Sequence, residues 1–203
     1  MSVGEYRKSD IKGTQLPAYP LVSEKPDFAA AWKTFSDADG IIIQPHPKTV
    51  IVQNPPAVPL STEEMDRIYE LPFARRQHPA IKETIPALAP IQFSIITHRG
   101  CFGACSFCSI THHQGKQIIS RSEESILREA KRMAKMPEFR GTISDVGGPS
   151  ANMYGAHCPK WEKHGACKNK SCIGCPSLQD GTARQLALLS EIPFNLAMGS
   201  RFF

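Results

Sequence analysis

Three cysteines, Cys101, Cys105 and Cys108, lie within eight residues, directly after a short apolar run at residues 91–96. Thiolates this close together can hold three corners of an iron–sulfur cluster, in which each iron needs one protein ligand besides its sulfides. The chain must curl tightly to do so, and Gly100 and Gly103 fit that need because glycine tolerates positive φ. No fourth cysteine lies nearby, so one iron would be bound by a distant residue or stay open for a small molecule.

Residues 91–203 alternate between strand and helix patterns, which predicts an α/β fold. Strands are expected at residues 91–96, 141–146 and 194–198, and helices from the N-cap Ser122 to about Pro137 and from a capping box at Thr182 to Ile192. Such alternation implies a parallel sheet with right-handed crossovers. Active residues in these sheets lie beyond the carboxyl ends of the strands, where the cysteine loop is found.

Residues 1–90 have a different character and are expected to form an irregular α+β extension and connector. Residues 1–26 are polar and carry several prolines, and residues 71–90 carry four. Between them, the patterns predict a helix at 27–36, strands at 41–43 and 50–52, and a helix from the capping box at Ser61 to about Glu70. The domain prediction is therefore an extension at 1–90 and a core at 91–203.

The core has only about three strand–helix units before the chain stops at Phe203. A three-stranded parallel sheet leaves open apolar edges and cannot close into a barrel. We therefore expect this chain to be a piece of a longer protein. The competing interpretation is a small open α/β domain whose sheet edge is covered by residues 1–90.

Composition narrows the class of protein. The net charge of +5 is mildly basic, and basic residues alternate with acidic ones, so direct nucleic-acid binding is not favoured. No apolar stretch approaches the roughly 18–20 residues needed to span a bilayer, and the N-terminus does not resemble a secretory signal. Seven cysteines, an odd number, argue against a disulfide framework. These features favour a cytoplasmic protein that uses its thiols for metal or redox chemistry.

The cysteine loop, with the aromatic Phe107 before its last cysteine, resembles the signature of radical S-adenosylmethionine (SAM) enzymes. In that superfamily the three thiolates bind a 4Fe-4S cluster whose open iron takes the amino and carboxylate groups of S-adenosyl-L-methionine. One electron then cleaves the sulfonium C–S bond and gives a 5′-deoxyadenosyl radical, chemistry that belongs to the cofactor. The resemblance implies an enzyme of this kind, with a small electron-donor protein of the flavodoxin or ferredoxin type as partner.

Longer segments are similar to the YgiQ-type radical SAM proteins. They are residues 94–101, 106–115, 120–126 and 145–154, with 19–22, 54–56 and 59–61 upstream. This resemblance covers nearly the whole chain and implies a fragment of such a protein, a partial radical SAM (β/α) barrel of about three units with an N-terminal extension. It does not supply a substrate.

The resemblance also implies roles for individual residues. Gly147 and Gly148 stand where radical SAM enzymes usually carry a Gly-Gly-Glu-like segment that contacts the methionyl amine, although Pro149 replaces the acidic residue. A plain turn after the strand is the competing interpretation. The ring of Phe107 is expected near the adenine, with packing in the core as the alternative.

Simpler interpretations of the cysteine loop remain open. Zinc accepts three cysteines and one histidine, so His112 or His113 could complete a structural zinc site in a non-catalytic binding module. The cysteines could also be thiols without a ligand. His98, Arg99 and the two histidines flank the loop, and a proton-donor or substrate role competes with a structural role for each of them.

A second group of four cysteines follows residue 150. It consists of Cys158, Cys167, Cys172 and Cys175. Four thiolates could bind zinc or an auxiliary iron–sulfur cluster, so this group predicts a possible second metal or cluster. Its spacing is irregular for a zinc ribbon, which prefers two Cys-x-x-Cys pairs, and reduced thiols without a metal are the alternative.

Overall fold

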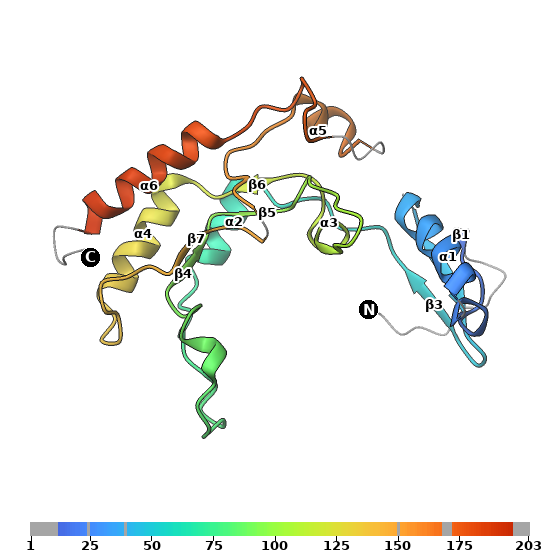
Figure 1. Ribbon diagram of the computed structural model, residues 1–203, viewed down its shortest axis with the longest axis horizontal. Helices are drawn as coiled ribbons and strands as arrows, with labels where there is room; N and C mark the ends of the chain where they lie inside the picture. Colours follow the sequence, from blue (N-terminus) through green and yellow to red (C-terminus); the bar gives the residue numbers. More distant parts are fainter. Residues whose placement is uncertain (1–11, 24, 39, 150, 168–171, 197–203) are drawn as a thin grey trace. The chain divides into compact units, whose positions relative to one another are not determined.

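The computed structural model describes residues 12–23, 25–38, 40–149, 151–167 and 172–196 of the chain (Figure 1). The chain divides into two compact units, Met1–Val58 and Pro59–Phe203. This division lies well before residue 90, the boundary expected from the sequence. The proline-rich connector at residues 71–90 thus belongs to the second unit, where its only regular element is the 3-10 helix η2 (Pro86–Leu88).

The first unit consists of a small mixed sheet and a helix. Strand β2 (Ile42–Pro45) pairs in antiparallel orientation with β3 (Val50–Gln53) and in parallel with β1 (Thr14–Gln15). The 3-10 helix η1 (Tyr19–Ser23) leads into α1 (Lys25–Asp37). These elements confirm the predicted helix and strand pair. The sequence pattern missed β1, because a two-residue strand is too short to show alternation.

The second unit is built around two parallel strands and two long helices. Strand β4 (Ser94–Ile96) pairs with β7 (Asp145–Gly147), and α4 (Glu123–Ala134) connects them. Helix α6 (Thr182–Leu196) packs along α4, as Figure 1 shows for the red and yellow helices. Their shared core contains Ile95, Ile126, Ala130, Met133, Tyr154, Leu188 and Ile192. The expected parallel pairing with a helical crossover is therefore confirmed for these two strands.

A narrow antiparallel ribbon forms the base of the cysteine loop. Its strands are β5 (His98–Arg99) and β6 (Ile119–Ser120), and the short helix α3 (Ile110–Gln114) lies between them. Helix α2 (Thr62–Tyr69) precedes the connector, and α5 (Pro159–His164) lies between β7 and α6. In the part of the chain that the structure describes, no helix is both long enough and apolar enough to cross a membrane.

Two of the three predicted helix starts are confirmed by their caps. Ser61 Oγ accepts from Glu64 N at 3.2 Å and the Glu64 carboxylate accepts from Ser61 N at 2.8 Å, a complete capping box. Ser122 Oγ accepts from Ser125 N at 3.1 Å. Thr182, however, is the first helical residue and not the N-cap, and its N–H donates to Asp180 Oδ1 at 3.0 Å. The capping box predicted there is wrong, although the helix begins where expected.

The third strand predicted for the core, at residues 194–198, is also wrong. Helix α6 continues through Leu196, while residues 197 and 198 lie outside the described residues. Pro193 stands in the last turn of the helix, where its missing N–H forfeits only one backbone hydrogen bond. The described part of residues 91–203 therefore has one parallel strand pair in place of three strands, and it contains no closed barrel.

A buried ion-pair network holds these elements together. Arg121 follows β6, is fully buried and pairs with Glu129 on α4. Its guanidinium also donates to Ile96 O and to Ser125 Oγ, both at 2.8 Å. The ring of Tyr69 from α2 lies 4.5 Å from the guanidinium carbon. One side chain thus contacts β4, α4 and α2.

Arg75 extends this network into the connector. It pairs with the same Glu129 carboxylate and donates to Gln92 O and Ser94 O, both at 2.9 Å. Glu129 is only 6% exposed, so two guanidinium groups share one carboxylate away from water. The connector, which has little regular structure, is fixed to β4 by these bonds.

We expect Glu129→Ala to lower the free energy of unfolding by about 3–5 kcal/mol, because it leaves Arg75 and Arg121 without their carboxylate in a buried place. The matched control is Glu70→Ala, which removes the exposed pair with Arg128 and should cost about 0–1 kcal/mol. Urea denaturation followed by circular dichroism measures both. Equal effects of the two substitutions would contradict a central role for Glu129.

Candidate metal and cofactor site

The cysteine loop is closed at its base by backbone hydrogen bonds. Cys101 N donates to Gly115 O at 2.9 Å, and Thr111 Oγ1 donates to Cys101 O at 3.0 Å. Gly100 has φ of +92°, and a Cβ there would lie 1.9 Å from Gln117 O. No other residue fits this position, so the expectation of positive φ is confirmed for Gly100. The same expectation is wrong for Gly103, whose φ is not positive.

Within the loop, the first two thiols face the same glycine. A Cβ on Gly103 would lie 3.4 Å from Cys101 Sγ and 3.6 Å from Cys105 Sγ, so both sulfurs lie close to this glycine. Cys108 N donates to Cys105 O at 3.0 Å, which closes a turn between the second and third cysteines. Cys101 is buried, whereas Cys105 is exposed. The sulfurs of Cys101 and Cys105 therefore both lie next to Gly103, and Cys105 is open to solvent.

The donor set suits a thiophilic metal centre. Three thiols on one curled loop are the ligands that an iron–sulfur cluster requires. Among the described residues, no three histidine, cysteine, aspartate or glutamate side chains already stand in an arrangement that would hold a metal ion. The ligand roles of Cys101, Cys105 and Cys108 stay predictions, and the closeness of the first two sulfurs to Gly103 agrees with them.

The segment at Gly147 and Gly148 meets the start of the cysteine loop. Thr97 N and Thr97 Oγ1 both donate to Gly147 O, at 2.7 and 3.1 Å. A Cβ on Gly148 would lie 2.2 Å from the His98 ring, so packing alone demands glycine there. This contact explains why glycine stands at position 148 without any role in cofactor binding. It also places the two glycines at the carboxyl edge of β4 and β7, beside the cysteine loop.

His98 is a buried imidazole with an unusual environment. Its Nδ1 lies 3.0 Å from Thr97 Oγ1, while its Nε2 has no hydrogen-bond partner among the described residues. The Thr97 hydroxyl also donates to Gly147 O at 3.1 Å, so His98 is joined through Thr97 to the glycine segment. Burial lowers the pKa of His98 to about 4, although the nearby backbone of Ala151 opposes the shift. The imidazole is therefore neutral at pH 7.

The remaining flanking residues differ in exposure. The Phe107 ring is 91% exposed, so the alternative that it packs in the core does not hold. The guanidinium carbon of Arg99 lies 6.0 Å from the centroid of the Tyr69 ring, which gives Arg99 a structural contact. His112 and His113 lie on α3 with their side chains exposed.

The second cysteine group lies in the segment around α5. Cys158 is the residue before that helix and is buried, as is Cys172. Cys167 and Cys175 are partly exposed. Among the described residues there is no disulfide. Metal binding by the group and reduced thiols without a metal both stay predictions.

Sequence reasoning gave no role to several residues that shape the site. Thr97 joins β4 to the glycine segment, Thr111 holds Cys101, and the Met153 side chain would touch a Cβ on Gly103 at 3.9 Å. All three lie in the segments that resemble the YgiQ-type proteins. Threonine and methionine do not by themselves indicate a place in a functional site, because both are common in ordinary cores and turns.

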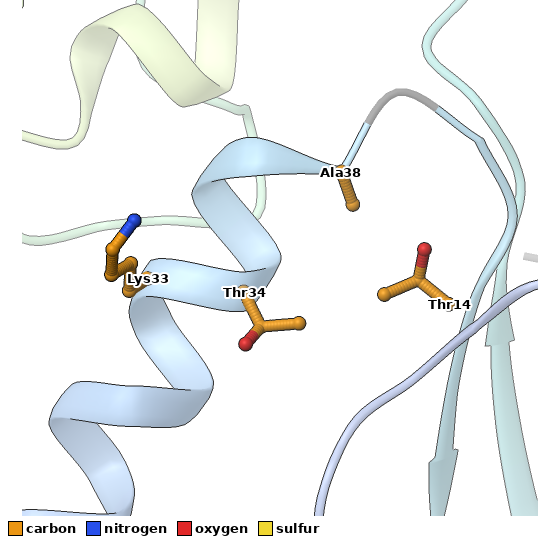
Figure 2. Close-up of a pocket in the computed structure, with 4 residues that line it drawn as sticks. All are labelled: Thr14, Lys33, Thr34 and Ala38. Carbon is orange, nitrogen blue, oxygen red and sulfur yellow. The ribbon is translucent and has the colours of Figure 1, made fainter.

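The first unit has a separate open pocket of about 370 Å³, lined by Thr14, Lys33, Thr34 and Ala38. Figure 2 shows the side chains of Thr14 and Thr34 pointing toward each other across it. None of the predicted cofactor or metal residues lines this pocket. It therefore adds nothing to the chemistry of the cysteine loop.

Comparisons with known proteins identify relatives of this chain. Residues 3–94 match the family model described as Radical SAM N-terminal. A UPF0313 protein of Methanocella arvoryzae is 52% identical over 187 residues, which are 88% of this chain and 31% of that protein. UPF0313 proteins of Methanosarcina acetivorans and Geobacter sulfurreducens are 50% and 52% identical, over 88% and 74% of this chain and 25% and 26% of their own lengths.

Two facts about the extent of these matches bear on function. The family model ends at Ser94, the first residue of β4, before the cysteine loop, and close to the boundary at residue 90 expected from the sequence. The chain spans only 25–31% of the length of these relatives.

We expect Gly148→Ala to destabilise the fold by about 1–3 kcal/mol, because the added methyl overlaps the His98 ring. In a His98→Ala background the ring is absent, and the same substitution should cost clearly less. A double-mutant cycle by urea denaturation measures the difference, with Gly40→Ala, where a Cβ meets no atom within 4 Å, as control. An equal cost in both backgrounds would show that this contact does not determine the glycine.

The pKa of His98 predicts a pH dependence of stability. Between about 4, its folded value, and 6.5, its ordinary value, the unfolded chain binds a proton that the folded chain does not. Stability therefore rises with pH across this window and is lost on acidification, by roughly 2–3 kcal/mol. We expect His98→Asn to flatten this part of the stability profile, measured by urea denaturation from pH 4 to 7. Substituting the exposed His78 should leave the profile as it is, and an unchanged profile for His98→Asn would refute the prediction.

Proposed function

The chain belongs to the UPF0313 family of YgiQ-type proteins with a radical SAM N-terminal domain, and from this premise we propose that the full-length protein is a radical SAM enzyme. In this proposal Cys101, Cys105 and Cys108 bind a 4Fe-4S cluster, and S-adenosyl-L-methionine binds beside it. The substrate is not assigned. The proposal concerns the whole protein, of which this chain is a part.

One observation carries the proposal: three cysteines occupy one tightly curled loop, in which the first two sulfurs lie close to Gly103. The loop follows β4, and the Gly147–Gly148 segment follows β7, its parallel neighbour. Both therefore lie beyond the carboxyl ends of paired strands, where α/β proteins place their active residues. A zinc-stabilised module would need the cysteines but not the adjacent Gly147–Gly148 segment.

When bound, the cluster supplies the electron that cleaves the sulfonium C–S bond of S-adenosyl-L-methionine to a 5′-deoxyadenosyl radical. A flavodoxin- or ferredoxin-type protein is the electron donor that this requires. The exposed Phe107 ring offers an apolar surface to the adenine. Backbone groups at Gly147 and Gly148 can approach the methionyl amine because no side chain intervenes. The neutral His98 adds no positive charge next to a cationic sulfonium.

The fold supports this proposal at a coarser level. Strand β4, helix α4, strand β7 and helix α6 form the alternation on which a radical SAM (β/α) barrel is built. We place these elements in the first part of such a barrel. The remaining strands would come from the rest of the full-length protein.

The test is anaerobic reconstitution of the full-length protein with iron and sulfide, followed by EPR of the reduced sample. We expect a cluster signal that S-adenosyl-L-methionine perturbs, because this ligand binds iron directly. Cys105→Ala should remove the signal almost completely, since three thiolates are the whole local ligand set. Ser106→Ala, at the neighbouring position, should retain it.

The competing outcome is specific. A colourless protein that binds zinc at the Cys101 loop and takes up no iron on reconstitution would replace the enzyme proposal by a zinc-stabilised module. A cluster signal that is insensitive to S-adenosyl-L-methionine would remove the proposal that one iron is open to it.

A further inference from the structure

The net positive charge of the chain is concentrated in two stretches that border the cysteine loop. They are residues 97–120, from the end of β4 to the end of β6, and residues 148–181, between β7 and α6. Together they contain six of the 24 lysine and arginine residues but only two of the 19 acidic residues, so they carry four of the five net positive charges. The rest of the chain is therefore nearly neutral.

The two acidic residues in these stretches have contacts of their own. The Glu162 carboxylate lies 3.7 Å from His157 Nε2. Asp180 Oδ1 accepts a hydrogen bond from Thr182 N at 3.0 Å, at the start of α6. Residues 97–120, which include the whole cysteine loop, contain no aspartate or glutamate. The surroundings of the loop are thus left with an excess of positive charge.

One face of helix α5 is basic. Successive residues of an α-helix are rotated by about 100°, so Lys160, Lys163 and His164 share one face, while Glu162 lies on the opposite side. The side chains of Lys160, Lys163 and His164 are exposed. Trp161 is only 7% exposed and attaches the helix to the core. Helix α5 is thus anchored by its tryptophan and presents two lysines to solvent.

Helix α5 packs directly against the cysteine loop. The centroids of the Trp161 and Phe102 rings lie 6.4 Å apart, and Phe102 follows Cys101 in the sequence. Lys116 Nζ donates to Cys167 O at 3.0 Å, which places a further positive charge between the end of the loop and the segment after α5. The lysines of α5 and Lys116 therefore border the loop.

We propose that Lys116, Lys160 and Lys163 form the docking surface for an acidic electron-donor protein. The inference rests on the proposed function, because an electron donor is needed only if the cysteine loop holds a cluster. In the docked complex the donor is oxidised by one electron and the cluster is reduced by one, without bond formation or proton transfer. A donor bound at α5 would lie next to Phe102, one residue from the first cysteine of the loop.

Charge and size favour this partner over a nucleic acid. Electron-transfer complexes use small and weakly bound interfaces, in which complementary charge mainly speeds the encounter. Three lysines on one short helix and the adjoining loop suit such an interface. A nucleic-acid site needs cations along an extended stripe, because it must neutralise successive phosphates. Outside the two stretches, basic and acidic residues are nearly equal in number.

The test measures binding of a flavodoxin with a net negative charge to the full-length protein, by isothermal titration calorimetry. We expect Lys160→Glu combined with Lys163→Glu to weaken binding about tenfold at about 50 mM salt, because two attractions become repulsions. The difference should shrink at about 200 mM salt, where exposed charges are more strongly screened. Circular dichroism should stay unchanged, since both lysines are exposed.

The control reverses the same number of charges on α4. Lys131 and Lys135 are exposed, and the last turn of α4 leads toward the amino end of β7, away from the cysteine loop. Lys131→Glu combined with Lys135→Glu should therefore change the affinity by less than about twofold. Lys160→Arg combined with Lys163→Arg keeps the positive charge of α5 and should also retain binding.

Three outcomes would overturn the proposal. Equal loss of affinity in the α4 and α5 variants would show that only net charge matters. Failure of the unchanged protein to bind either the flavodoxin or an acidic ferredoxin would remove the partner. Loss of binding to a single-stranded RNA oligonucleotide in the α5 variant, with flavodoxin binding unchanged, would assign the surface to a nucleic acid.

Reduction kinetics separate docking from the cluster itself. In anaerobically reconstituted protein, photoreduced deazaflavin is a small reductant and should reduce the cluster equally fast in the unchanged protein and the α5 variant. Reduced flavodoxin should reduce the α5 variant about tenfold more slowly. Equal slowing with both reductants would contradict selective docking. A protein that forms no cluster would refute the proposed function, while the binding comparison would still decide whether this surface docks the acidic protein.

Discussion

The ion-pair network of Arg121, Glu129 and Arg75 is the constraint on which the second unit depends. Burying two guanidinium groups and one carboxylate is costly unless each charge is paired and hydrogen-bonded. The chain meets this condition only when the connector, β4, α4 and the residue after β6 come together, because the partners are spread over these elements. The Tyr154 hydroxyl adds a bond to Arg121 O at 3.1 Å and ties in the segment after β7. The network therefore selects one arrangement among several that hydrophobic packing alone would allow.

The cysteine loop takes its position from this network. Arg121 N donates to Thr97 O at 2.9 Å, and Thr97 in turn donates to Gly147 O. The buried Arg121 therefore also fixes Thr97, which joins β4 to Gly147. The ribbon of β5 and β6 continues from this pair and closes the base of the loop. A loop that presents thiols to a cofactor needs such a rigid base, because its own residues have little regular structure to hold them. The contacts that pair the charges in the core thus also hold the base of the cysteine loop at the edge of the sheet.

Local signals in the sequence predicted the elements that local physics determines. The capping box at Ser61, the cap at Ser122 and the turn-like glycine at Gly100 each depend on a few neighbouring residues, and the structure confirms them. The strand expected at residues 194–198 failed because Leu196 and its neighbours suit the end of a helix that packs on α4 at least as well as a strand. Arg121 could not be identified as a core residue, since nothing near it in sequence reveals Arg75 or Tyr69. The reason for Gly148 was likewise hidden, because the His98 ring that requires it lies on another strand.

The contacts between the two cysteine segments suggest why one chain would carry both. The centroids of the Phe102 and Trp161 rings lie 6.4 Å apart. Met153 packs against the buried cluster that contains Trp161, and it also lies 3.9 Å from where a Cβ on Gly103 would be. Lys116, on the closing side of the Cys101 loop, donates to Cys167 O. The same apolar side chains therefore pack against both the Cys101 loop and the segment around α5, so the packing of one segment limits the motion of the other.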